Sequence, residues 1–119
     1  TTDRETKSVS AEETFAEDIN DRQSLIDEIQ RLSARVADSL SDHGLVARTV
    51  TLKLRNSEFV TITRSTSRDR STADDQAIFA DALELLSANW VDGDPVRLVG
   101  VGASNLRLVR APGQLAMDI

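Results

Sequence analysis

Besides Arg97, the segment RLVGVGASNL contains four residues of types that can bind an anion: Gly100, Gly102, Ser104 and Asn105. A dinucleotide-binding loop needs a third glycine and a helix directly after it. Neither follows here, so a dinucleotide site is excluded. Glycines inside a strand instead indicate a bulge or a close backbone approach. The Ser104 hydroxyl and the Asn105 amide could hold phosphate oxygens, and the alternative interpretation is a plain turn after the strand.

Nucleophilic and metal-based catalysis find little support among the residue types present. The sequence has no cysteine and no tyrosine, and His43 is its only histidine. Without cysteine there is no thiolate nucleophile, disulfide or Cys-rich metal site. His43 stands just before Gly44, where a helix is expected to end, and we interpret it as a solvated residue at the helix C-terminus. The acidic pair in Asp92-Gly93-Asp94 lacks the further ligands of a Ca²⁺ loop and is interpreted as a turn.

The distribution of charge suggests a partner that the total charge does not. A net charge of −6 argues against nucleic acid. However, residues 45–66 hold four bases against one acid, residues 95–117 hold three bases and no acid, and residues 73–94 hold six acids and no base. The bases fall on segments with strand patterns and the acids on a helical pattern. If helices cover one sheet face, the domain has an acidic side and a basic side.

Length and composition predict one globular domain. The chain has 119 residues, of which 39% are hydrophobic and 29% are charged, enough for one core. No apolar run reaches the roughly 18 residues of a membrane span, and the N-terminus lacks the apolar stretch of a signal peptide. We expect a cytoplasmic protein with a domain over residues 7–109, a linker or tail at 1–6, and a C-terminal tail at 110–119.

Hydrophobic periodicity predicts a short strand over residues 7–15 and then a helix between residues 18 and 44. Asp21 is the expected N-cap and Gly44 the residue after the C-terminus. The apolar stripe of this helix recurs at spacings of three and four residues. It consists of Leu25, Ile29, Leu32, Val36 and Leu40.

Residues 45–55 alternate with period two, which is typical of a half-buried strand. Val50, Leu52 and Leu54 fall on one face, and the other face carries Thr49, Thr51, Lys53 and Arg55. A short turn at 56–58 and a second strand at 59–65 complete a predicted β-hairpin. One face of this hairpin is apolar, and the other is hydroxyl-rich and cationic.

A polar loop at 66–75 is expected to lead into a second helix over residues 74–90, with Ser71 or Thr72 as its N-cap. The stripe of this helix consists of Ile78, Phe79, Ala82, Leu85 and Leu86. A turn at 92–95 precedes the last strand at 96–109.

The element order β-α-β-β-α-β predicts an α+β fold. Two helices with one apolar stripe each should cover one face of a four-stranded, mainly antiparallel sheet. The other face is polar and cationic and remains free. It is either a solvated surface or a binding surface.

The segments KSVSAEETF, ARTVTLKLR, FVTITRS and PVRLVGVGASNL, in this order and spacing, resemble the little finger domain of Y-family translesion DNA polymerases, nearest to the bacterial DNA polymerase IV branch. The resemblance runs from Lys7 to Leu106. It implies a non-catalytic domain that grips primer–template duplex through backbone phosphates, with its sheet facing the major groove. The family's catalytic carboxylates and Mg²⁺ belong to a palm domain with no counterpart here, so no cofactor is expected in this chain.

The resemblance also implies DNA-binding residues. Lys7 and Ser8 match the first strand, Arg48 a basic position on the second, Thr63, Arg64 and Ser65 a T-R-S element, and Arg97 a basic position on the last strand. Together with candidates from the residues themselves, the expected DNA-binding set is Lys7, Ser8, Arg48, Lys53, Thr63, Arg64, Ser65, Arg97, Ser104 and Asn105.

Two of these residues conflict with strand alternation. Arg64 has the parity of Ile62, and Arg97 has the parity of Val99. A twist or a bulge near the strand ends is needed to bring both arginines to the polar face.

Gly102 and Ala11 depart from relatives that carry a basic residue at these positions. Both departures imply a weaker grip on DNA.

The tail QLAMDI resembles the sliding-clamp-binding peptide of bacterial polymerases. In such a peptide Gln114 makes polar contacts, and Leu115, Met117 and Ile119 fill apolar pockets. Asp118 departs from the usual residue and weakens the match.

The implied partners are duplex DNA, the bacterial sliding clamp (its beta subunit) and the polymerase core of the parent chain, with no membrane partner. The alternative function is a protein-interaction module that docks the clamp or another repair protein without appreciable DNA binding. The net charge favours this alternative, and the bases on the strands disfavour it. Salt separates the two, because phosphate binding weakens steeply with salt and apolar docking does not.

Overall fold

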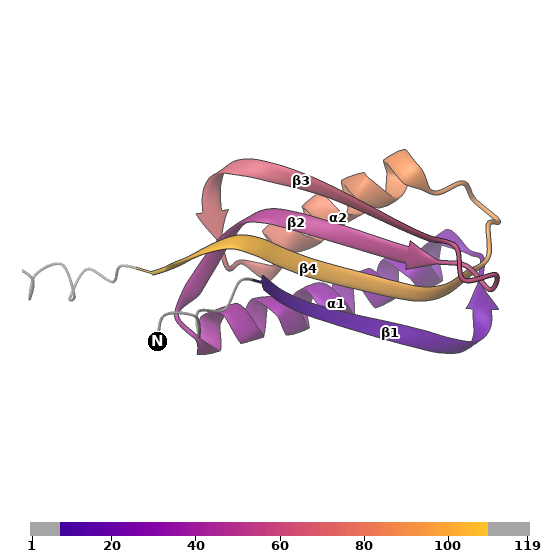
Figure 1. Ribbon diagram of the computed structural model, residues 1–119, viewed down its shortest axis with the longest axis horizontal. Coiled ribbons are helices and arrows are strands. Elements are labelled where there is room, and N and C mark those ends of the chain that lie inside the picture. Colours follow the sequence, from indigo (N-terminus) through magenta and orange to yellow (C-terminus); the bar gives the residue numbers. More distant parts are fainter. Residues whose placement is uncertain (1–7, 110–119) are drawn as a thin grey trace, which may run out of the picture.

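The structure, a computed structural model, describes residues 8–109 as one sheet with two helices packed on the same face (Figure 1). The elements are β1 (Ser8–Ile19), α1 (Arg22–Asp42), β2 (Leu45–Arg55), β3 (Thr61–Thr72), α2 (Asp75–Asn89) and β4 (Val96–Leu108). All strand pairs are antiparallel, and the spatial order is β1-β4-β2-β3. The predicted α+β fold and element order are confirmed.

Helix α1 forms as its sequence predicts. The Asp21 side chain accepts a hydrogen bond from the Ser24 N–H at 2.9 Å, and this bond lowers the pKa of the Asp21 carboxyl. At the other end His43 is the C-cap, and Gly44 has a φ of 66°, a conformation that glycine adopts readily. All five residues of the predicted stripe are buried.

Helix α2 begins later than expected and has a different cap. The Asp74 carboxylate accepts from the Ala77 N–H at 3.3 Å, so the prediction of Ser71 or Thr72 as N-cap was wrong. Thr72 instead accepts a hydrogen bond from the Asp74 N–H at 3.0 Å. The aspartate takes the cap because it stands directly before the first helical residue, where its carboxylate also meets the positive end of the helix dipole.

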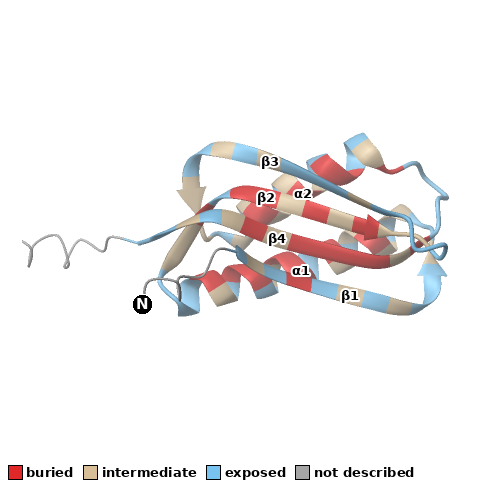
Figure 2. Ribbon diagram, viewed as in Figure 1, coloured by how far each residue is buried: buried red, intermediate tan, exposed pale blue. Residues whose placement is uncertain are grey.

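The hydrophobic core lies between the helices and one sheet face. Helix α1 contacts β1 and β4, and α2 contacts β2 and β3. Figure 2 shows the consequence: the two middle strands are largely buried, while the outer strands β1 and β3 are mostly exposed. The middle strands therefore fix the position of any side chain on the uncovered face.

Strand β3 differs most from the prediction. Residues 59–65 were expected as the strand and 66–75 as a loop, but β3 runs from Thr61 to Thr72. Phe59 and Val60 instead belong to the hairpin turn, where the Asn56 side chain accepts from the N–H groups of Glu58 and Val60 at 2.9 and 3.0 Å. This asparagine fixes the turn, so the strand starts only after Val60.

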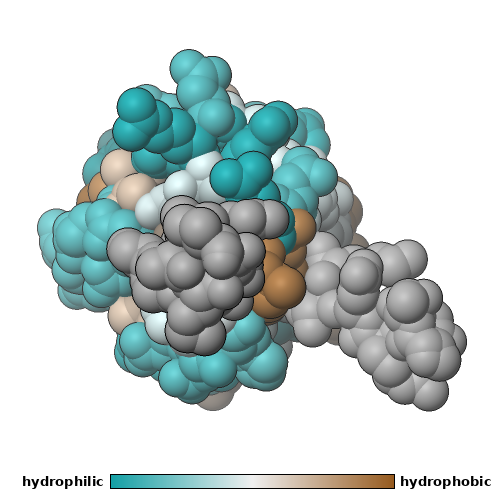
Figure 3. All heavy atoms as spheres, turned by 90° about the vertical axis from the view of Figure 1, so that its left-hand side faces the viewer, coloured by the Kyte–Doolittle hydropathy of each residue, from teal (hydrophilic) through white to brown (hydrophobic). Residues whose placement is uncertain are grey.

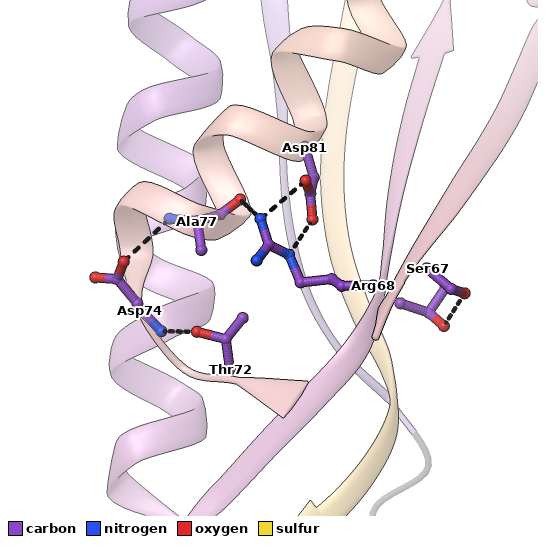
Figure 4. Close-up of polar contacts among 7 residues, drawn as sticks. Ser67, Arg68, Thr72, Asp74, Ala77 and Asp81 are labelled. Carbon is purple, nitrogen blue, oxygen red and sulfur yellow. Dashed lines mark hydrogen bonds and ion pairs between the residues drawn. The ribbon is translucent and has the colours of Figure 1, made fainter. Parts of the chain in front are cut away.

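The second half of β3 is held by an ion pair to α2 (Figure 4). The Arg68 guanidinium donates to both Asp81 carboxylate oxygens at 2.7 and 3.1 Å and to the Ala77 carbonyl at 3.3 Å. The hydrogen bond to Asp81 raises the pKa of Arg68. A charged contact thus holds a polar segment in the sheet that apolar patterning could not identify.

Ser33 offers a test of the core. Its side chain is fully buried in α1, and its hydroxyl has no hydrogen-bond partner within the part of the chain that the structure describes. Replacing Ser33 with alanine should stabilise the domain by about 0.5–1 kcal/mol, because it removes an unsatisfied buried hydroxyl and improves helix propensity. Urea unfolding measures this, with Ser39→Ala, half-buried on the same helix, as the propensity control. Equal gains in the two variants would show that the buried hydroxyl costs nothing.

Candidate nucleic-acid interface

The sheet face away from the helices, here called the open face, is built from four rows of side chains that run across β1, β4, β2 and β3. Directly paired residues of antiparallel strands point to the same side of the sheet. Val50, Leu52, Val99 and Val101 belong to the core, so the residues alternating with them make the open face. The rows are Ser8, Ser104, Thr49, Ser67; Ser10, Gly102, Thr51, Ser65; Glu12, Gly100, Lys53, Thr63; and Thr14, Leu98, Arg55, Thr61.

Hydroxyl groups dominate the open face, and several are paired across β2 and β3. Thr49 and Ser67 hydroxyls lie 2.8 Å apart, as do those of Thr51 and Ser65. In each pair only one hydroxyl is the donor, so the other keeps its O–H for a further partner. Such a surface presents donors to an anion without presenting a base-specific pattern.

Two cations and one carboxylate, together with Gly100, Gly102 and Leu98, complete the four rows. Arg55 donates through Nε to the Thr61 hydroxyl at 2.8 Å, and within residues 8–109 its terminal nitrogens have no acceptor, so they can meet a phosphate. Lys53 Nζ lies 3.3 Å from Glu12 Oε2, so the lysine charge is shared with a carboxylate of the same row. The open face is therefore polar but only weakly cationic.

Gly100 and Gly102 form a glycine furrow along β4, between the side chains of β1 and β2. The pairing of β4 is continuous through both glycines, so they do not mark a bulge. A Cβ on Gly100 would lie 3.3 Å from the Glu12 Cβ and 3.4 Å from the Lys53 Cβ. Glycine at position 100 therefore lets the Glu12 and Lys53 side chains approach the β4 backbone closely.

Ser104 and Asn105 lie within β4, so the alternative of a plain turn was wrong. Asn105 has a φ of 55°, in the left-handed region that asparagine adopts more readily than most other non-glycine residues, and its side-chain amide donates to the Thr49 hydroxyl. This side-chain donor therefore lies beside the first row of hydroxyls.

Arg48 on β2 and Asn105 on β4 each add one residue to the regular two-residue alternation of their strand. Inward-facing residues normally recur every two positions along a strand. Here Ala47 and Val50 both face the core, as do Ala103 and Leu106, and each pair is three residues apart. Thr49 still pairs with Ser104 and Ala47 with Leu106, so the two irregularities lie side by side. Exposed Arg48 is held at this kink.

Arg64 does not lie on the open face, contrary to the expectation. It pairs directly with buried Leu52, and no register shift separates Thr61 from Ser67. Its side chain therefore faces the helix side at the exposed sheet edge, where Nη1 donates to the Thr63 carbonyl at 3.0 Å. Of the T-R-S element, Thr63 and Ser65 lie on the open face.

The alternation of β4 is irregular next to Arg97. Val96 and Val99 both face the core although they are three residues apart, and the β1–β4 register shifts between Thr14 and Ile19. Arg97 donates through Nε to the Asp18 carboxylate at 2.7 Å, so its charge is also partly neutralised.

The sequence-based set missed Arg55 and Glu12. Arg55 shares the parity of Lys53, and Glu12 shares the parity of Ser8, so alternation was a usable signal for both. Lys7 and the predicted clamp peptide, with Gln114, Leu115, Met117 and Ile119, lie outside the described residues.

The end of the molecule from which β4 leaves the sheet combines hydrophilic and hydrophobic surface (Figure 3). Leu108 is 71% exposed and Val109 42% exposed at this end. Apolar side chains thus lie next to the start of the segment that contains the predicted clamp peptide.

Two kinds of site are not found within residues 8–109. Groups of three or more His, Asp or Glu side chains placed to hold a metal ion do not occur there. Neither of the helices described has the length and apolar character to cross a membrane.

Residues 6–117 match the C-terminal domain of the impB/mucB/samB family. The chain is 42% identical over 104 residues to DNA polymerase IV of Streptomyces coelicolor, covering 87% of this chain and 22% of that protein. It is 41% identical over 116 residues to DNA polymerase IV of Halorhodospira halophila, covering 98% and 32%. The chain thus spans less than a third of the length of these relatives.

Two solved structures share the fold. A complex of the beta-clamp processivity factor with the little finger domain of PolIV superimposes with a TM-score of 0.67 at 24% identity, covering 82% of this chain and 86% of that chain. A Y-family DNA polymerase chimera superimposes with a TM-score of 0.69 at 13% identity, covering 88% and 30%. At these identities the likeness is one of fold.

Proposed function

Because this chain belongs to the impB/mucB/samB family as its C-terminal domain, the little finger of Y-family DNA polymerases, we propose that it grips primer–template DNA with its open face. The observation that carries the proposal is the four rows of hydroxyl and cationic side chains that the two helices leave uncovered. Hydroxyls and cations bind phosphate oxygens and carry little base information. Such a grip suits an enzyme that copies many sequences and damaged templates.

The dimensions of the open face support a groove-spanning position. Strands lie about 4.8 Å apart, so four strands span roughly 14 Å. The major groove of B-DNA is about 12 Å wide. Phosphates of one DNA strand would then meet β1 and those of the other would meet β3, with β4 and β2 over the groove.

The proposed domain has no catalytic role of its own. Polymerase chemistry and Mg²⁺ belong to the palm domain of the parent enzyme. Residues 1–6 would link this domain to the rest of that enzyme. The parent enzyme would act in the cytoplasm. The proposed DNA contacts are the open-face residues of the sequence-based set, together with Arg48, Asn105 and Arg55, and with Lys7 beyond the described residues.

The experiment that tests this function is a fluorescence-anisotropy titration of primer–template duplex at two salt concentrations. Non-specific phosphate binding falls in the range of about 10⁻⁴–10⁻⁶ M and weakens steeply between roughly 50 and 200 mM salt. We expect that behaviour. The net charge of −6 and the Glu12 carboxylate on the open face favour the alternative, a protein-interaction module. Absence of binding at about 50 mM salt, or salt-independent binding, would support that module instead.

Adding a positive charge to the glycine furrow should strengthen the grip. A Cβ on Gly102 would lie 3.5 Å from the Ser10 Cβ and 4.0 Å from the Thr51 Cβ, which are ordinary contacts, so a side chain fits. We expect Gly102→Arg to raise DNA affinity about three- to tenfold at low salt. The slope of log affinity against log salt concentration should become steeper by about 0.9. Gly102→Gln is the neutral control. If it strengthens binding equally, charge is not the cause.

We also propose that the C-terminal tail, residues 114–119, binds a bacterial sliding clamp. A short peptide of this kind docks by one polar contact and two or three apolar side chains that fill pockets. When the peptide is removed, no other segment supplies these contacts. Deleting residues 114–119 should abolish binding to a bacterial sliding clamp and leave DNA affinity unchanged. Surface plasmon resonance on immobilised clamp measures the first effect, and the DNA titration measures the second. Clamp binding that survives the deletion would assign the contact to the domain body.

A further inference from the structure

We propose that the Glu12 carboxylate forms an ion pair with Lys53 on the open face and thereby limits how tightly the domain grips DNA. The proposal rests on the proposed DNA-gripping function and assigns a regulating residue to that surface. Glu12 and Lys53 share the third row, and the ammonium and carboxylate lie 3.3 Å apart. The carboxylate is the only one in the four rows of the open face within residues 8–109.

The glycine furrow makes this contact possible. β1 and β2 are not neighbours, because β4 lies between them, so their backbones are about 10 Å apart. Glu12 and Lys53 reach each other over Gly100, where a Cβ would crowd both of their side chains at 3.3 and 3.4 Å. A side chain at position 100 would therefore separate the pair.

The pair is exposed enough to be replaced by DNA. The Lys53 side chain is 33% exposed and the Glu12 side chain 48% exposed, and exposed ion pairs contribute little free energy. A phosphate that approaches Lys53 must displace the carboxylate and then stay beside it. The carboxylate repels that phosphate, so Lys53 contributes less to binding in the wild-type protein than a lysine without a carboxylate beside it would.

Glu12→Gln removes the repulsion while it keeps side-chain size. We expect Glu12→Gln to raise affinity for primer–template duplex about tenfold at 50 mM salt and to steepen the salt dependence by about 0.9, the value of one phosphate contact. Glu13→Gln is the matched control. It makes the same change in net charge on the same strand, but Glu13 faces α1 and pairs with Arg31 at 3.3 Å.

A second comparison tests Lys53 itself. In the wild-type background Lys53→Gln should weaken binding less than about threefold, because its charge is already engaged. In the Glu12→Gln background the same change should weaken binding about tenfold, because there Lys53 contacts phosphate.

The outcomes separate the two proposals. If the wild type binds DNA in a salt-dependent way and Glu12→Gln equals Glu13→Gln, the grip is real and the role of Glu12 is overturned. Equal losses from Lys53→Gln in both backgrounds would also overturn it. If neither the wild type nor Glu12→Gln binds at 50 mM salt, the DNA-gripping function itself fails.

Discussion

A protein in which Arg48 and Arg55 are both glutamine is expected to bind primer–template DNA roughly 100-fold more weakly at low salt. Each arginine contact to phosphate is worth about 1.5 kcal/mol or more, and two such contacts correspond to about a hundredfold in affinity. The two residues stand seven positions apart on β2, roughly 23 Å. They would therefore hold phosphates near opposite ends of β2.

Anisotropy titrations at several salt concentrations measure this prediction, and the slope should fall by about two because two phosphate contacts are lost. The control is Arg31→Gln with Arg35→Gln. It removes the same charge from exposed positions on α1, on the other side of the sheet. Equal losses in the two double variants would mean that DNA responds to total charge and not to the open face.

Leu52→Ala should cost about 2–5 kcal/mol of the free energy of unfolding. Leu52 is fully buried at the centre of β2, which pairs with β4 on one side and β3 on the other. Because both neighbouring strands are fixed by their own pairing, the cavity cannot collapse well. For a domain with a total stability of about 5–15 kcal/mol, this is a large fraction.

Urea unfolding followed by circular dichroism gives the value. Leu108→Ala is the matched control, since the same atoms are removed from a side chain that is 71% exposed, and its cost should stay within about 0.5 kcal/mol. A Leu52→Ala cost near that of the control would contradict the packing of β2 against α2.

The fold was predictable where apolar residues follow a clear period. Both helices and β2 formed at or near their predicted bounds, because their stripes are long and regular. Residues 66–72 were not predictable as strand. Their inward contact is the ion pair of Arg68 with Asp81 rather than an apolar side chain, and hydroxyl-rich sequence otherwise indicates a loop.

The candidate site was predictable strand by strand but not as an assembled surface. Alternation identified Thr49, Thr51 and Lys53 as the polar face of β2, which the structure confirms. Alternation also predicted the true side of Arg64, against the interpretation that placed it on the polar face. The Glu12–Lys53 contact depends on β4 lying between β1 and β2, and the strand order does not follow from spacing along the chain.

The paired extra residues on β2 and β4 have a consequence for how such a domain can change through evolution. Loss of Asn105 alone would restore regular alternation on β4, and Arg48 would then have no counterpart on β4 and would form a β-bulge. Loss of Arg48 alone would leave Asn105 without a counterpart on β2 in the same way. Loss of both together would straighten the kink and keep the partners aligned. Among descendants of this sequence, the lengths of these two strands should therefore change together, even though β2 ends at Arg55 and β4 begins only at Val96.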